Sequence, residues 1–121
     1  MKLPNLMLGR VLFTIPFMVF GLFHFMGADK MSGMVPTWLP GGALWVYLSG
    51  IALIAAPIAV LTKKKAVLAC QLLALMLIGF VLTVHLPGFL AGGDMAQLSM
   101  ISILKDLSMA GGALILAHTA E

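Results

Sequence analysis

The sequence predicts an all-α membrane protein, an antiparallel four-helix transmembrane bundle with both termini in the cytoplasm. Of its 121 residues, 62% are hydrophobic and only 9% are charged, whereas charged residues make up about 25% of an average soluble domain. Four apolar stretches are each close to the roughly 20 residues that cross a bilayer, and Gly, Pro or Lys segments separate them. We expect one transmembrane domain over residues 1–121, with contacts to lipid and none to nucleic acid.

The first span is predicted over residues 6–27 and is interpreted as a retained anchor. A cleaved signal peptide would have a shorter apolar region, and the exit from this span lacks a small-x-small cleavage pattern. Arg10 lies about one turn inside the span, where its long side chain is expected to snorkel to the near interface. His24 shares a helix stripe with Gly21 and Ala28, and small residues favour packing against another helix. We therefore expect His24 to point inward and to bond a backbone carbonyl.

Three further spans are predicted, over residues 43–61, 66–86 and 98–118. Residues 28–42 form the first connection, because their Pro and Gly residues stop helices. This connection either covers the mouth of the bundle or serves only as a linker, and its Trp38 is typical of an interfacial anchor. Pro87 and Gly88 are predicted to end the third span.

The lysines are distributed unevenly along the chain. Lys63 to Lys65 occupy the tight second connection, and Lys2 and Arg10 flank the start of the first span, whereas the opposite side offers only Lys30. Positive residues in short loops remain on the cytoplasmic side. The termini are therefore predicted to be cytoplasmic and the protein to lie in the cell (inner, or cytoplasmic) membrane.

Polar residues gather at one depth of the predicted bundle, in its outer half. His24 and His85 end ascending spans, and Lys105 and Asp106 lie about 10–12 Å down the last one at a rise of 1.5 Å per residue. Because consecutive helical residues point about 100° apart, Lys105 and Asp106 are not expected to face each other. Charges at bilayer depth are costly unless they are paired, so each is expected to find a partner on another helix.

Several interpretations of this cluster stay open. It forms a pocket for an apolar molecule with a polar head, such as a quinone, whose carbonyls need donors and whose reduction needs titrating groups. Alternatively, it is a buried ion pair that sets the register of the helices. A haem or metal held by His24 and His85 is less favoured, because no ligand motif accompanies them, and we expect no metal site. A small transporter is a further alternative, although the second span carries no charged side chain.

The order and spacing of several short motifs resemble the DoxX family of small four-helix membrane proteins over nearly the whole chain. The motifs are Gly9-Arg10, Gly27 with Lys30, Pro36 with Leu39-Pro40, His85-Leu86-Pro87, and Leu104-Lys105-Asp106-Leu107 before Gly111-Gly112. The resemblance implies four transmembrane helices and an oxidoreductase component. Some members of that family look like the membrane subunit of a thiosulfate:quinone oxidoreductase.

Carried over to this chain, the resemblance implies functional roles for Lys30, His85, Lys105 and Asp106. One departure is that family members often carry a glutamate in the second span, where this chain reads Ser-Gly-Ile-Ala-Leu-Ile-Ala-Ala from Ser49. Asp106 is then the only carboxylate expected deep in the bundle, which weakens a proton-coupled reaction.

Together these observations predict a membrane subunit of a redox system that binds a quinone-like or other apolar small molecule and is not a complete enzyme alone. The predicted ligand-binding residues are His24, Lys30, Trp38, His85, Lys105 and Asp106. A redox partner protein and self-association are further expectations. The alternatives are a non-catalytic structural or scaffolding subunit and a small transporter.

Reporter fusions test the predicted orientation. A reporter fused after Thr62 should signal a cytoplasmic position and one fused after Gly92 an external position, because the lysine-rich connection remains inside. An external signal at Thr62 would reverse the orientation and move the predicted pocket to the inner leaflet.

Overall fold

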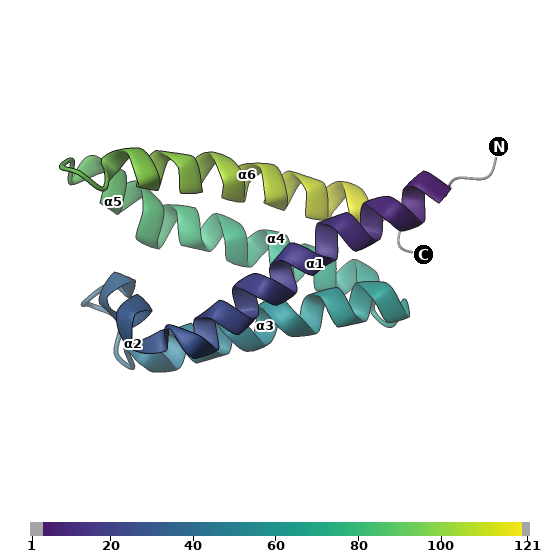
Figure 1. Cartoon of the computed structure of the whole chain (residues 1–121), viewed down its shortest axis with the longest axis horizontal. Coiled ribbons are helices and arrows are strands. Elements are labelled where there is room, and N and C mark those ends of the chain that lie inside the picture. Colours follow the sequence, from purple (N-terminus) through teal and green to yellow (C-terminus); the bar gives the residue numbers. More distant parts are fainter. Residues whose placement is uncertain (1–3, 120–121) are drawn as a thin grey trace.

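A computed structural model describes residues 4–119 as an all-helical protein (Figure 1). Its elements are α1 (Pro4–Met26), α2 (Ala28–Met31), the 3-10 turn η1 (Ser32–Met34), α3 (Ala43–Thr62), α4 (Ala66–Phe80), the π-helical turn η2 (Val81–His85), α5 (Leu86–Leu90) and α6 (Ala96–Thr119). Four helical stretches are long and apolar enough to cross a membrane, at residues 6–26, 43–62, 66–90 and 96–119. The predicted antiparallel bundle of four long apolar helices is confirmed.

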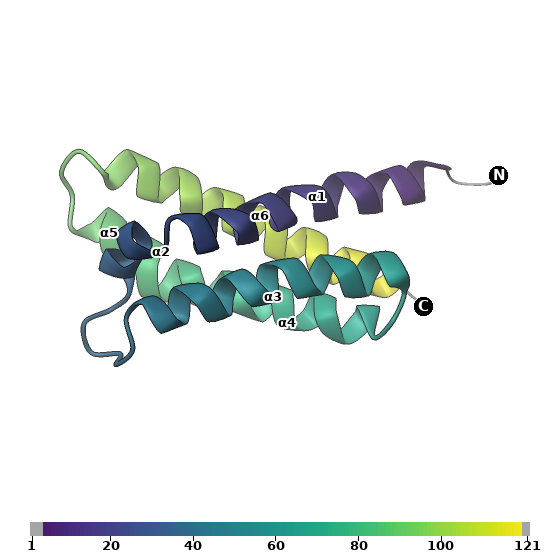
Figure 2. The same cartoon turned by 60° about the horizontal axis from the view of Figure 1, so that its bottom comes forward.

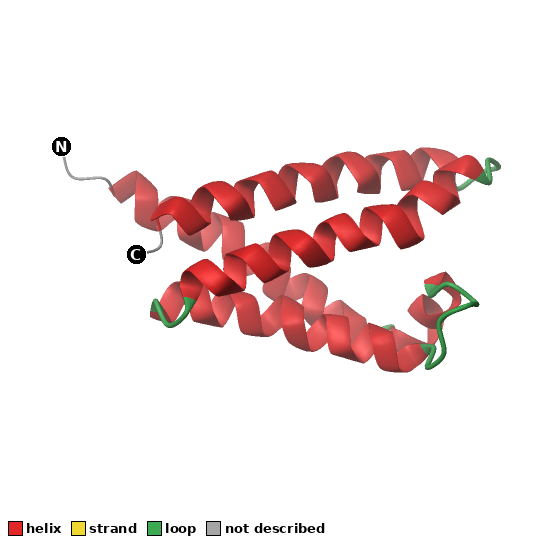
Figure 3. Ribbon diagram, turned by 180° about the vertical axis from the view of Figure 1, so that it is seen from behind, coloured by secondary structure: helices red, strands yellow, loops and turns green. Residues whose placement is uncertain are grey.

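The bundle consists of two helix pairs. α1 packs along α3, and α6 packs along α4, while α3 also contacts α4. The two pairs diverge toward the end that carries α2 and α5 (Figure 1), and both short helices lie at that same end in Figure 2. Loops lie only at the two ends of the described bundle, and the α3–α4 turn lies at the same end as the start of α1 and the end of α6 (Figure 3). The core between the pairs is apolar and includes Phe17, Leu53, Leu73, Leu77 and Ala113.

Glycine allows α1 and α3 to approach closely. A Cβ added at Gly21 would lie 2.6 Å from a side-chain carbon of Ile54 and 2.9 Å from the carbonyl oxygen of Gly50. Gly50 in turn faces the side chain of His24, because a Cβ built there would lie 3.0 Å from the His24 Cβ. The predicted stripe of small residues on the first span therefore does pack on another helix, as expected for membrane helices.

Arg10 is buried, which corrects the expectation that it snorkels to the interface. Its side chain is 7% exposed, and its Nη2 donates a hydrogen bond to the carbonyl oxygen of Thr119 at the end of α6. The last carbonyls of a helix have no intrahelical donor and carry partial negative charge. The guanidinium therefore stays inside and joins the ends of α1 and α6.

The third span does not end at Pro87, as the sequence predicted, but continues to Leu90. The π-helical turn before it makes this possible, with the N–H of Leu86 bonded to the carbonyl oxygen of Val81. In a regular α-helix the proline ring would clash with the carbonyl four residues earlier. A wider turn relieves that clash, and Pro87 then occupies the first turn of α5, where a missing N–H has no consequence.

Replacing Gly21 by alanine should destabilise the protein, whereas the same change at Gly9 should not. The Gly21 methyl group forces Gly50 or Ile54 to move, and overpacking of this kind costs about 1–3 kcal/mol. An added Cβ at Gly9 meets nothing within 4 Å, and alanine is the better helix former by about 1 kcal/mol. Thermal unfolding in detergent measures both variants, and equal melting temperatures would contradict the close α1–α3 contact.

Candidate functional site

The divergence of the two helix pairs leaves a cavity of about 660 Å³ between them, toward the end that carries α2. Aromatic and aliphatic side chains from α1, α3, α4 and α6 form most of its wall. The first connection borders the partly open cavity at the loop end with the side chains of Met31, Met34, Val35, Pro36 and Leu39. Of the two predicted roles for this connection, the structure supports a cover over the bundle mouth.

Four of the six predicted site residues line this cavity, namely His24, His85, Lys105 and Asp106. His24 comes from the last turn of α1, His85 from the end of η2, and the charged pair from the middle of α6. Helices of the two different pairs thus contribute polar groups to one otherwise apolar space.

Asp106 is the centre of the polar cluster. Its side chain is only 4% exposed, and its two oxygens have different partners. His85 Nε2 lies 3.2 Å from Oδ2, and Lys105 Nζ lies 3.6 Å from Oδ1. The predicted partner for Asp106 on another span is therefore found, and it is His85. A buried carboxylate without such a partner would be strongly unfavourable.

Lys105 does reach Asp106, which corrects the expectation that the two adjacent residues do not face each other. Their Cα–Cβ directions differ as predicted, but the flexible four-carbon stem of lysine brings the ammonium back toward the carboxylate. The same ammonium lies 4.7 Å from the centroid of the Phe20 ring on α1, a cation–π distance. The Lys105 side chain remains 45% exposed, so it is the accessible member of the cluster.

His24 makes the backbone bond that the sequence predicted. Its Nδ1 lies 2.7 Å from the carbonyl oxygen of Phe20, four residues earlier. A carbonyl only accepts, so Nδ1 carries the proton, and in the neutral ring Nε2 is an acceptor. The ring therefore has one nitrogen committed to the helix and one available to a molecule in the cavity.

His85 belongs to the π-helical turn in the third span. Such a turn holds one more residue than an α-helical turn, so the side chains after it are rotated by about 100° relative to an uninterrupted helix. His85 is the last residue of η2, and it is directed at the carboxylate of Asp106. The only sequence signal for this feature is Pro87, which was interpreted as a helix end.

Lys30 and Trp38 are not among the residues that line the cavity. Lys30 is exposed on α2, and Trp38 is 73% exposed. The cavity is lined instead by Trp45, in the first turn of α3. The Trp45 indole N–H donates to the carbonyl of Pro40, and a side chain at Gly41, where φ is +116°, would collide with that indole.

Within residues 4–119, no three His, Cys, Asp or Glu side chains converge closely enough to hold one ion. The cluster is better suited to hydrogen bonding, because it offers an ammonium, a carboxylate and two imidazoles beside aromatic walls.

Comparison with protein families places residues 13–112 in a domain of unknown function, DUF8561. The chain belongs to the DUF8561 family. The match covers all four long helices in part or in full, and it carries no assignment to the DoxX family. No curated protein and no solved structure matches the chain. What these findings establish is a multi-pass membrane protein of the DUF8561 family.

Removing His85 should destabilise this DUF8561 protein more than removing Lys105. His85→Leu leaves the buried Asp106 with only a half-exposed lysine, and breaking a buried pair costs about 3–5 kcal/mol. Lys105→Met leaves the contact between Asp106 and His85 intact and should cost no more than about 1 kcal/mol, as for exposed pairs. Thermal unfolding in detergent gives the order of the two variants. A larger loss for Lys105→Met would show that His85 is not the main partner of the carboxylate.

Proposed function

We propose that this protein is a membrane subunit that binds a quinone-like molecule in the cavity around Asp106, in the outer half of the cytoplasmic membrane. The observation that carries the proposal is one cavity with apolar walls and a polar cluster contributed by three different spans. Ligand sites are typically apolar clefts of about 300–1,000 Å³ with a few polar groups that orient the ligand. The motifs shared with the DoxX family favour a redox role for the same residues.

The polar groups suit a flat ring with oxygen substituents. Lys105 is a donor for a carbonyl oxygen, and the free Nε2 of neutral His24 is an acceptor for a hydroxyl. Trp45, Phe20 and Phe80 supply aromatic surface against which a ring packs. The residues present would therefore hold either the oxidised or the reduced form of such a head group.

A bound quinone would supply two-electron redox chemistry that the protein's own side chains lack. The contribution of the chain is to orient the head group and to hold a proton near it. His85 is the residue placed to exchange a proton with the head group, because its imidazole lines the cavity and a ring nitrogen can either donate or accept a proton. Electrons would come from a partner redox protein, since no redox-active pair of cysteines exists in a chain with one cysteine.

A structural role is the second candidate, and one observation favours it. Both oxygens of Asp106 already have partners within the chain, His85 and Lys105. A cluster of this kind can hold helices in register without any ligand. In that case the cavity would be filled by lipid tails, and no quinone would bind with measurable preference.

Tryptophan fluorescence separates the two candidates, because the chain has two tryptophans and only Trp45 lines the cavity. In Trp38→Phe, a short-tailed benzoquinone should quench the remaining Trp45 emission and reach saturation. Adding Lys105→Met should weaken this binding by about tenfold or more, since a hydrogen bond to a charged group contributes about 1.5–3 kcal/mol.

The matched control is Trp45→Phe, which leaves the exposed Trp38 as the sole emitter. Its quenching should rise without saturation, as expected for random collision with quinone dissolved in the micelle. Identical, non-saturating curves for the two single-tryptophan proteins would exclude quinone binding in the cavity and leave the structural role.

A further inference from the structure

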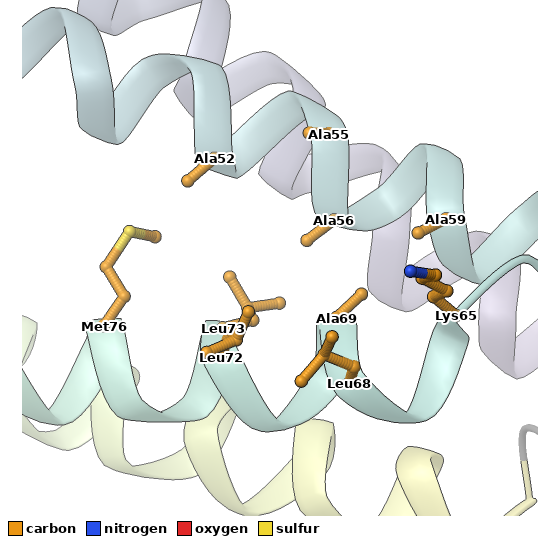
Figure 4. A pocket seen from close by; sticks show the side chains of 10 residues that line it. All are labelled: Ala52, Ala55, Ala56, Ala59, Lys65, Leu68, Ala69, Leu72, Leu73 and Met76. Atoms are coloured by element: carbon orange, nitrogen blue, oxygen red, sulfur yellow. The ribbon is translucent and has the colours of Figure 1, made fainter.

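A second, smaller cavity lies between α3 and α4, toward the end of the bundle that carries the Lys63–Lys65 turn. It is a groove of about 320 Å³. Figure 4 shows Ala52 and Ala56 pointing into it from α3, Leu73 facing them from α4, Met76 at one end and Lys65 at the other. α3 contributes four alanines to this groove, and their small side chains leave space between the two helices. The leucines of α4 form the opposite wall.

Positive charge is concentrated at the lysine end of this groove. Lys65 lines the groove itself, and Lys63 and Lys64 are exposed in the same three-residue turn. Among residues 4–119, none of the three has an ion-pair partner. The first turn of α4 begins directly after Lys65, and no side chain caps it, so its free N–H groups also favour an anion.

We propose that this groove binds an anionic phospholipid, with one acyl chain against the alanines and the phosphate at the Lys63–Lys65 turn. The two parts of the groove match the two parts of such a lipid. A flexible hydrocarbon chain fills a narrow apolar furrow, and basic residues at the membrane surface attract anionic head groups. Lys65 joins the parts, because its stem borders the furrow and its ammonium lies at the end (Figure 4).

A second copy of the chain is a poorer occupant. Two copies related by an axis along the membrane normal place the same turn on the same side of the membrane. Packing the groove of one copy against that of another would therefore bring six lysines together, and like charges repel. An anionic lipid would instead neutralise part of the lysine charge. The charge at the groove therefore favours a lipid over a second copy of the chain.

Native mass spectrometry of the detergent-solubilised protein tests the site with phosphatidylglycerol and phosphatidylcholine as probes. One phosphatidylglycerol should remain bound under conditions that strip phosphatidylcholine. Lys65→Gln should reduce the retention of phosphatidylglycerol about fivefold, because it removes the attraction of one lysine for the anionic head group. The triple Lys63–Lys65→Gln variant should abolish the preference for phosphatidylglycerol over phosphatidylcholine. Ala52→Leu, which fills the furrow, should reduce retention of phosphatidylglycerol under these conditions and of both lipids under milder ones.

Two controls match these variants. Lys30→Gln removes a lysine at the other end of the bundle, and Gly111→Leu adds bulk at an exposed helix position where an added Cβ meets nothing. Both should bind phosphatidylglycerol like the wild type. Equal retention of the two lipids, or an equal loss in Lys30→Gln, would overturn the proposal. A dimer that dissociates in Ala52→Leu, without lipid preference, would assign the groove to a second copy.

Discussion

The burial of one carboxylate sets the arrangement of the cavity end of the molecule. Asp106 lies in the middle of an apolar helix with almost no exposed surface, and a charge in that position requires partners. His85 reaches it from the neighbouring span and Lys105 from its own helix. The π-helical turn, the direction of His85 and the polar side of the cavity are all consistent with this one requirement.

The two helix pairs explain why a cavity exists at all. α1 and α3 approach closely because Gly21 and Gly50 lack side chains, and α4 and α6 form a pair of their own. At the lysine end, Arg10 joins α1 to the end of α6, whereas the opposite ends of the pairs diverge (Figure 1). The space between the diverging ends is filled only in part, by the short α2–η1 segment and the polar cluster.

The two ends of the bundle consequently carry different chemistry. The cavity end presents titratable groups beside the apolar walls of a large cavity, which suits a small molecule with a polar head. The lysine end presents three exposed lysines that have no ion-pair partner among residues 4–119, beside an apolar furrow, which suits the head group and tail of a lipid. Met76 borders both cavities, so the furrow and the large cavity are neighbours along α4.

The sequence by itself determined the four long apolar helices, their antiparallel order and the common level along the bundle of His24, His85, Lys105 and Asp106, because hydrophobic length and residue spacing along a helix are local properties. Only the tertiary structure decided which groups touch. Lys105 turns back to Asp106, Arg10 points inward to a helix end, and Trp45 rather than Trp38 lines the cavity. These outcomes depend on side-chain flexibility, on carbonyls exposed at a distant helix end and on the path of a loop. The periodicity of a single span contains no information about these three features. It also contains none about the π-helical turn that allows the third span to continue past Pro87.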